Sequence, residues 1–361
     1  MTEIAPQIYE LIMDLVNKGK YTSVESFVDV SIRNQITIEK SSSQEIGRKV
    51  TEIPPEKSSH SALHQLRRNM EQNLLTVPSI SVDQKRRTEP MWGLINRLVP
   101  AKVVLRMLVN ALAQSKTQWL DFRQFSDEVV TISYQIRNQT EKFERRSDVV
   151  RGQSLKIGFP MKDRKSQQRF VDLFIGKLRG ENQLGGLLGD LELIALRRSQ
   201  QGSMNNTIIG ITESGLQWAN MDSPFIDDFI SSQKPIQRPL SYEETHFLLS
   251  RIKETKPGDY EFLKYIYKLV REGVNTPDKL TDHTAMYLES LKLNPALFNT
   301  FQTGGIARLV EMRIIQLDKN GIHTRYAVTS TASSLEELRL SIAKYRSNAQ
   351  EIKNEREHEI S

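Results

Sequence analysis

Residues 191–218 read LELIALRRSQQGSMNNTIIGITESGLQW, and this stretch decides how the middle of the chain folds. Leu191–Leu196 and Thr207–Thr212 are apolar segments of the kind that forms short strands. The polar stretch between them contains Gly202, which accepts the positive φ angles of a tight turn. Thr212 is placed to cap a helix that follows at once. The sequence therefore predicts a β-hairpin that leads directly into a helix.

Helical periodicity precedes the hairpin, and the order of the elements carries a resemblance. Apolar residues recur at helical spacing over 103–112, 126–136 and 169–178. A short extended piece covers 119–122. In many winged-helix repressors a phrase L-T-x-x-G-x-x-[LA] closes the hairpin, and Ile211–Leu216 has that shape. Residues 95–222 therefore resemble a winged-helix domain, which implies a wing that meets DNA phosphates.

The C-terminal part of the chain repeats this succession of helices and hairpin. Helical spacing covers 245–252 and 260–271. Asn320-Gly321 lies between two apolar segments, which is a strong signal for the tip of a hairpin. Residues 240–340 therefore resemble a second winged-helix domain. Because winged helices also bind proteins, DNA contact and protein contact both stay open for this part.

Positive charge is concentrated between Arg137 and Arg179. This segment holds 12 Lys and Arg against 5 Asp and Glu, so its net charge of +7 exceeds the +6 of the whole chain. Its centre is longer than the turn of a winged helix, so we expect an insertion with a hairpin through Leu155–Phe159 and a helix that starts near Ser166. A basic loop of this kind contacts phosphates or is simply solvated.

The predicted DNA contacts come from the basic segment, the helix after it and the two wings. We expect phosphate contacts from basic side chains and base reading from the exposed face of the Gln167–Arg179 helix. The predicted DNA-binding residues are Arg151, Lys156, Lys162, Arg164, Lys165, Gln167, Gln168, Arg169, Lys177, Arg197, Arg198, Lys319 and Arg325.

The first forty residues form a separate predicted unit of two short helices. The turn NKGKYTSVESFV (residues 17–28) and its flanks resemble the two-helix part of the ribbon-helix-helix family over residues 2–38. That family dimerises and reads DNA with an N-terminal strand, but residues 2–5 carry no Lys or Arg. DNA contact, dimerisation alone and an ordinary helical hairpin all stay open. The predicted dimerisation residues are Ile8, Leu11, Leu15, Val24, Phe27, Val28 and Ile32.

Composition excludes several function classes. The 361 residues contain no Cys, which excludes disulfides, thiolate zinc sites and iron–sulfur clusters. No apolar run reaches the ~20 residues of a membrane helix, and the first residues lack the basic start of a secretory signal. We find no phosphate-binding or catalytic motif. His60 and His64 stand at i, i+4 in a polar stretch, where exposed side chains are a better interpretation than metal ligands.

The sequence thus predicts a mainly α protein with small β wings. The predicted divisions are a ribbon-helix-helix-like dimerisation unit (1–40), a flexible linker (41–90), a winged-helix-like domain with a basic insertion (91–230), a second winged-helix-like domain (240–342) and a charged tail (343–361). We expect a cytoplasmic, non-enzymatic homodimer that binds double-stranded DNA without metal or cofactor and away from membranes. Transcriptional regulation is the leading hypothesis. A plasmid-type replication or partition protein and a winged-helix interaction subunit, with protein partners on the C-terminal domain, are the alternatives.

Overall fold

The protein is described from a computed structural model in two units, Met1–Pro55 and Glu56–Ser361, each taken by itself. The structure describes residues 9–10, 13–14, 17, 23–24, 66, 74–80, 84–145, 154–179, 183–199, 206–232, 234–236, 238–320 and 323–329.

The described residues of the first unit are mostly helical. Tyr9, Glu10, Met13, Asp14 and Asn17 have helical backbone, as the apolar periodicity of the sequence predicts. Val24 is also helical and is half-buried. The other predicted dimerisation residues lie outside the described residues.

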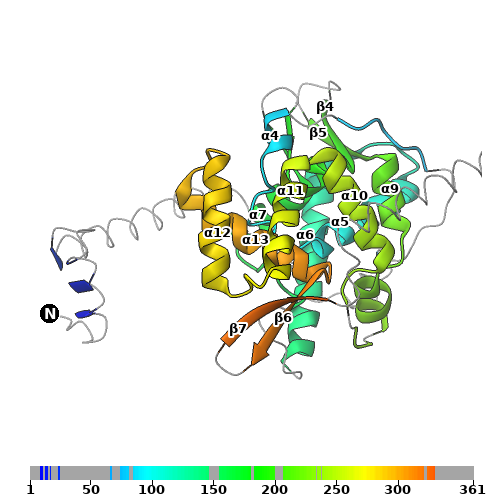
Figure 1. Ribbon diagram of the computed structural model, residues 1–361. Helices are drawn as coiled ribbons and strands as arrows, with labels where there is room; N and C mark the ends of the chain where they lie inside the picture. Colours follow the sequence, from blue (N-terminus) through cyan, green and yellow to red (C-terminus); the bar gives the residue numbers. More distant parts are fainter. Residues whose placement is uncertain are drawn as a thin grey trace, which may run out of the picture. The chain divides into compact units, whose positions relative to one another are not determined.

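The second unit contains a middle lobe (residues 99–232), in which helices surround a small sheet (Figure 1). Its helices are α5 (Val99–Ser115), α6 (Phe122–Glu144), α7 (Arg164–Phe170), the π-helix η2 (Val171–Ile175), α8 (Leu187–Asp190), α9 (Glu213–Asn220) and the π-helix η3 (Pro224–Ile230). Its strands are β1 (Leu120–Asp121), β2 (Lys177–Arg179), β3 (Gln183–Gly185), β4 (Ile194–Ser199) and β5 (Asn206–Ile211).

The predicted hairpin and its closing helix are confirmed. Strands β4 and β5 pair antiparallel, with Ile194 opposite Ile211. Strand β1 pairs with the other edge of β5, so the sheet order is β1-β5-β4. The Thr212 side chain accepts a hydrogen bond from the Gly215 backbone at 3.1 Å and so caps α9. Helix α5 is buried along most of its length and packs against β5 and α9.

Two expectations for the basic segment are wrong. The expected hairpin at Leu155–Phe159 is a turn without strands. The helix starts at Arg164, close to the predicted start near Ser166, but it ends at Ile175, before the predicted end at residues 178–179. Gly176, which follows, is extended, and a Cβ there would lie 2.8 Å from the Gly185 carbonyl oxygen. The chain therefore leaves the helix into β2 and pairs with β3.

The C-terminal lobe (residues 238–329) is a helical bundle with one hairpin. Its elements are α10 (Tyr242–Thr255), α11 (Pro257–Arg271), α12 (Pro277–Ser290), the 3₁₀ helix η4 (Pro295–Leu297), α13 (Phe298–Glu311), β6 (Ile315–Asn320) and β7 (His323–Val328). Strands β6 and β7 pair antiparallel, as the Asn-Gly signal predicts. The described residues are thus mainly helical with small antiparallel sheets. Within those residues, no helix combines the length and apolarity needed to cross a membrane.

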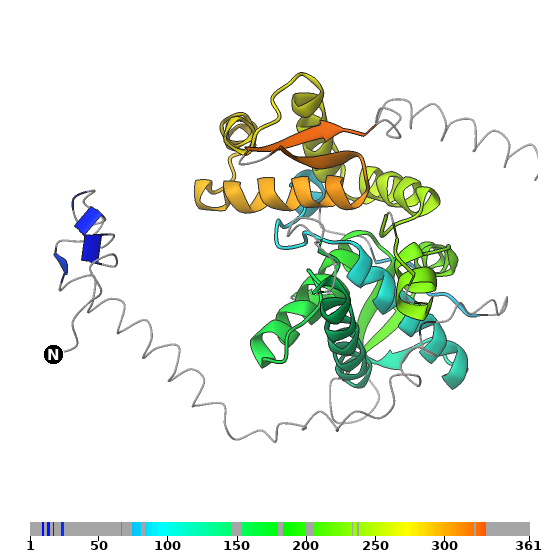
Figure 2. The ribbon, with the colours of Figure 1, turned by 90° about the horizontal axis from the view of Figure 1, so that it is seen from below.

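A connecting segment (residues 84–98), which begins with the short helix α4 (Gln84–Thr88), ties the two lobes together (Figure 2). The Met91 backbone donates to the Asp259 carboxylate at 2.8 Å, and Arg308 donates to the Ile95 carbonyl oxygen at 2.7 Å. Arg308 also pairs with Asp259 at 2.7 Å, and both side chains are fully buried. The segment between Met91 and Leu98 therefore covers one face of α13.

The closest approach in this packing involves two glycines. A Cβ on Gly304 would lie 2.3 Å from the Gly93 carbonyl oxygen and 2.6 Å from its Cα. A Gly-to-Ala change inside a helix ordinarily stabilises by about 0.5–1 kcal/mol, but overpacking costs about 1–3 kcal/mol. We therefore expect Gly304→Ala to lower the free energy of unfolding by about 2 kcal/mol in urea titrations. Asn299→Ala, at an exposed position of the same helix, is the control; a Gly304→Ala protein as stable as this control would contradict the packing.

Two acidic side chains of the C-terminal lobe also contact helix α5. At its start, the Glu311 carboxylate accepts hydrogen bonds from the Leu98 backbone at 2.5 Å and the Val99 backbone at 3.3 Å. One turn later, Lys102 pairs with Glu244 of α10 at 2.9 Å, and both side chains are fully buried. Burial lowers the pKa of Lys102 to about 8 and raises the pKa of Glu244. These contacts place charged groups between the lobes, where the sequence patterns indicated none.

The buried Glu311 makes the stability of the fold depend on pH. Burial raises its pKa from 4.5 to about 7, against the opposing effects of Arg97 and the two backbone hydrogen bonds. Between these values the folded protein holds a proton that the unfolded chain has released, so stability falls as the pH rises through this window. We expect the wild-type protein to lose up to about 3 kcal/mol more than Glu311→Gln between pH 4.5 and 7.5. Urea titrations at several pH values measure this, and parallel profiles would contradict it.

Candidate nucleic-acid interface

The outward face of α7 is basic, and its inward face is apolar. Phe170 and, in η2, Phe174 are buried in the core, and their rings lie 5.3 Å apart. The opposite face, together with Lys162 just before the N-cap, exposes a cluster that we call the α7 cluster; it consists of Lys162, Arg164, Lys165, Gln168 and Arg169. Figure 2 shows α7 at the periphery of the middle lobe. The predicted reading helix is therefore exposed, although it is shorter than expected.

The chain around the α7 cluster is held by local hydrogen bonds. The Asp163 carboxylate caps α7 by accepting from the Ser166 backbone at 2.8 Å, and the Ser166 hydroxyl accepts from the Met161 backbone at 2.9 Å. The half-buried Gln167 donates its amide to the Lys162 carbonyl oxygen at 3.0 Å. Gln167 thus fixes the start of α7, and Gln168 is the exposed amide on this helix.

Acidic side chains near α7 are few and have local partners. Residues 162–177 contain five Lys or Arg and two Asp. Asp163 is the helix cap, and Asp172 accepts from Gln168 at 2.9 Å and lies 3.7 Å from the Lys177 ammonium nitrogen. This surface therefore carries a local excess of positive charge, which favours contact with a polyanion.

Two further predicted residues, Arg197 and Arg198, are exposed on β4, which packs beside β2. The Arg197 guanidinium lies over the ring of Trp119, 4.1 Å from its centroid. Trp119 precedes β1, and β5 lies between β1 and β4, so this contact crosses the solvent face of the sheet. No local pattern in the sequence pairs Trp119 with Arg197, because the strand order that brings them together is a long-range feature.

Lys156 has a structural role in the fold. Its ammonium group lies 3.2 Å from Glu141 of α6 and lowers the pKa of that carboxyl. Its carbonyl oxygen accepts from Arg137 at 3.1 Å, which holds the turn that precedes α7. Lys156 therefore anchors the turn before α7 to α6. It precedes the α7 cluster in the sequence and does not belong to it.

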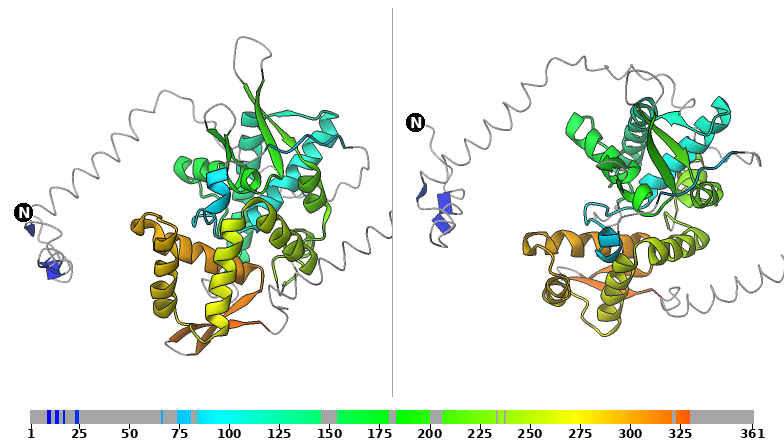
Figure 3. Two further views of the ribbon diagram at one scale, coloured as in Figure 1. Left: turned by 45° about the horizontal axis from the view of Figure 1, so that its top comes forward. Right: turned by 90° about the horizontal axis from the view of Figure 1, so that it is seen from above.

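The predicted residues of the C-terminal wing are distant from the others. Arg325 is exposed on β7, and Lys319 lies on β6, where its side chain is outside the described part. The hairpins β4–β5 and β6–β7 lie at opposite ends of the second unit (Figures 1 and 3). Arg151, like His60 and His64, lies outside the described residues. The structure therefore separates the predicted DNA-binding residues into at least two surfaces.

The comparisons with known proteins found no match: no family model, no curated protein and no solved structure is similar to this chain.

Proposed function

We propose that the protein binds double-stranded DNA through its middle lobe and acts as a transcriptional regulator without enzymatic activity. The observation that carries the proposal is the exposed α7 cluster, backed by the buried aromatic face of the same helix. The element order supports it: α5, β1, α6, α7 and the β4–β5 hairpin, with sheet order β1-β5-β4, follow the succession of a winged helix, into which η2, the β2–β3 hairpin and α8 are inserted between α7 and β4. The helix expected to enter the major groove then corresponds to α7.

The C-terminal lobe has a similar succession, with α11, α12, α13 and the β6–β7 hairpin. The Tyr326 backbone donates to the Asn275 carbonyl oxygen at 2.8 Å, which adds a short third segment beside β7. Helix α13 would be its reading helix, but the connecting segment covers it, and residues such as Gly304 and Arg308 are buried. We therefore assign the DNA contact to the middle lobe. For the C-terminal lobe we infer contact with a protein partner instead of DNA.

The first experiment is fluorescence anisotropy of the purified protein on a random-sequence duplex. We expect affinity to fall steeply between about 50 and 200 mM salt, because each phosphate contact releases counterions. The same titration with a double-stranded and a single-stranded probe tests the preference for duplex. An absence of binding at the lowest salt would contradict the proposal and favour the alternative of an interaction subunit.

The double variant Arg197→Ala, Arg198→Ala tests the wing. If both side chains contact phosphates, we expect the slope of log affinity against log salt to become shallower by up to about two units. Binding to all duplex sequences should weaken by a similar factor, since phosphate contacts carry no sequence information. A control variant with Lys268→Ala and Lys279→Ala, both exposed in the C-terminal lobe, changes the net charge equally. Equal salt slopes in the two variants would show that the β4–β5 hairpin does not contact DNA.

The N-terminal unit enters the proposal as a dimerisation unit, and the regulator would then act as a homodimer in the cytoplasm. Two copies related by twofold symmetry bind a palindromic site. Replication or partition, the second candidate, predicts instead an array of direct repeats. Selection of bound sequences from a random library distinguishes the two.

A further inference from the structure

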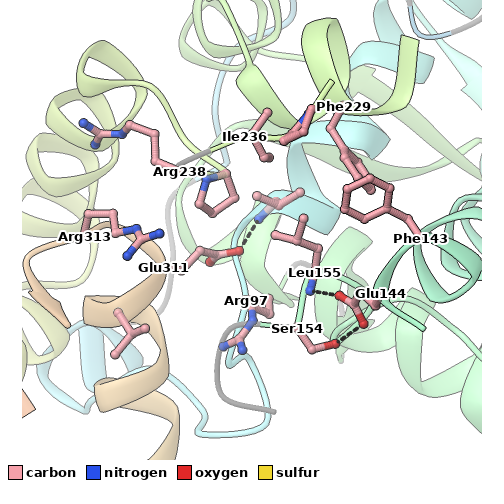
Figure 4. Close-up of a pocket in the computed structure, with 14 residues that line it drawn as sticks. Arg97, Phe143, Glu144, Ser154, Leu155, Phe229, Ile236, Arg238, Glu311 and Arg313 are labelled. Carbon is pink, nitrogen blue, oxygen red and sulfur yellow. Dashed lines mark hydrogen bonds between the residues drawn. The ribbon is translucent and has the colours of Figure 1, made fainter. Parts of the chain in front are cut away.

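A pocket of about 180 Å³ lies where residues of both lobes meet the turn before α7 (Figure 4). Its walls come from the start of α5, the end of α6, the turn at Ser154, η3, residues 235–239 and the end of α13. Most of its described lining is apolar, including Phe143, Phe229, Ile236 and Val310. An apolar cavity of about 150 Å³ can hold one benzene molecule, so this pocket has room for a single ring with a small substituent.

The two acidic side chains of the pocket wall already have partners. Glu144 accepts from the Ser154 hydroxyl at 2.7 Å and from the Leu155 backbone at 2.5 Å. Glu311 accepts from the backbones at the start of α5. Both carboxylates therefore hold segments of the wall in place.

The buried Arg97 is likewise engaged within the protein. Its guanidinium donates to the Asn96 carbonyl oxygen at 2.8 Å. Burial lowers its pKa, whereas the charges of Glu311 and Glu144 raise it. These two carboxylates of the same pocket therefore act as the countercharges of Arg97.

The two other arginines of the wall are also accounted for. The Arg238 guanidinium donates to the Leu240 carbonyl oxygen at 2.5 Å and lies 3.7 Å from the ring centroid of Tyr242. Figure 4 shows it turned away from the pocket, and it shows Arg313 beside Glu311. The charged groups of the described wall thus compensate one another or bind the backbone, and an ionised ligand would find no counterion of its own.

We propose that this pocket binds a small neutral molecule with one apolar ring, which packs against Phe143, Phe229 and Ile236. The burial of apolar surface is the driving force for such binding. An ionised group on the ligand would lose its hydration without gaining a partner, so charge on the ligand weakens binding. Water gains little beside the apolar walls, because a buried water typically makes about three hydrogen bonds. The inference does not depend on DNA binding, since no residue of the pocket belongs to the α7 cluster.

Benzyl alcohol is the probe, and its binding to the full-length protein is followed by ligand-observed NMR titration. We expect saturable binding with a Kd on the order of 1 mM, which is modest for a molecule of this size. Benzoate and benzylammonium have nearly the same shape and carry a negative and a positive charge. Each should bind at least about tenfold more weakly than benzyl alcohol, because its charge would be buried without a counterion.

Two variants fill the pocket from different sides. Ile236→Trp and Val310→Phe each place a larger side chain in the space of the ring, so each should weaken benzyl alcohol binding by about tenfold or more. Leu291→Trp is the matched control, since it adds the same side chain at an exposed position outside the pocket. This control should bind benzyl alcohol as the wild type does.

Three outcomes would overturn the proposal. The first is an absence of saturable benzyl alcohol binding at about ten times the expected Kd. The second is wild-type affinity in both filling variants, which would place the probe elsewhere. The third is an affinity for benzoate or benzylammonium equal to that for benzyl alcohol. Thermal unfolding verifies that the variants fold, and the comparison of the three probes on the wild type decides without them.

Discussion

Replacing the four cations of the α7 cluster by alanine (Lys162, Arg164, Lys165 and Arg169) is expected to abolish most duplex binding. These side chains are exposed on one face, and their removal deletes up to four phosphate contacts. The salt slope should become shallower by about two to four units, and affinity near 100 mM salt should fall by a factor on the order of a hundred to a thousand. Anisotropy on one duplex over a salt series measures both quantities.

The matched control changes the same number of charges on the other lobe. Lys253, Lys268, Lys279 and Lys292 are all exposed there, and their replacement by alanine lowers the net charge from +6 to +2, as in the first variant. If both quadruple variants lose affinity equally, overall charge governs binding and α7 is not the interface. Far-UV circular dichroism verifies that the helix content of both variants is retained.

A second large effect is expected from the buried ion pair between Asp259 of α11 and Arg308 of α13, within the C-terminal lobe. Arg308→Met leaves the fully buried Asp259 carboxylate with its bond from the Met91 backbone and without its cation. Breaking such a pair on one side costs about 3–5 kcal/mol, because the remaining charge stays buried. We expect the free energy of unfolding in urea to fall by this amount.

Two further variants determine whether the unpaired charge is the cause. Arg325→Met, an exposed position in the same lobe, should leave stability within about 0.5 kcal/mol of the wild type. The double variant Arg308→Met, Asp259→Leu removes both charges and should be more stable than Arg308→Met alone. If Arg308→Met unfolds at the same urea concentration as the wild type, the ion pair contributes no net stability.

Local signals in the sequence predicted much of the fold. The hairpin β4–β5 follows from two apolar segments around a polar turn, and the cap at Thr212 follows from its position before α9. The apolar pattern predicts the start of α6 four residues too late, because the helix begins at its cap: the Asp121 side chain accepts a hydrogen bond from the Gln124 backbone at 2.8 Å. Boundaries were missed where a capping residue competed with the apolar pattern.

The ion pairs between residues distant in sequence could not be predicted from local patterns. Lys102 and Arg106 stand within an apolar helix, where an isolated sequence does not identify their partners. Arg106 donates to both carboxylate oxygens of Asp227, at 3.0 Å each, across 121 residues of sequence. Partners this distant in sequence are fixed by the tertiary fold.

The α7 cluster is a local feature of the sequence, whereas the pocket of Figure 4 is not. The α7 cluster consists of neighbours in the sequence, so charge and helical spacing suffice to place them on one face. The pocket gathers Arg97, Leu155, Ile236 and Arg313 from four distant segments. No spacing in the chain links these residues, and the apolar ones among them have the pattern of ordinary core positions.

The connecting segment limits how the gene for this protein can be divided. A protein that ends before residue 235 lacks Asp259 and Arg308, which bind the connecting segment. A protein that starts near residue 240 lacks the segment from Met91 to Leu98, which covers α13. Neither half retains the interior that the two share. We therefore expect the lobes to be inherited, exchanged and expressed together, so a chimera that takes the middle lobe of this protein must also take the C-terminal lobe.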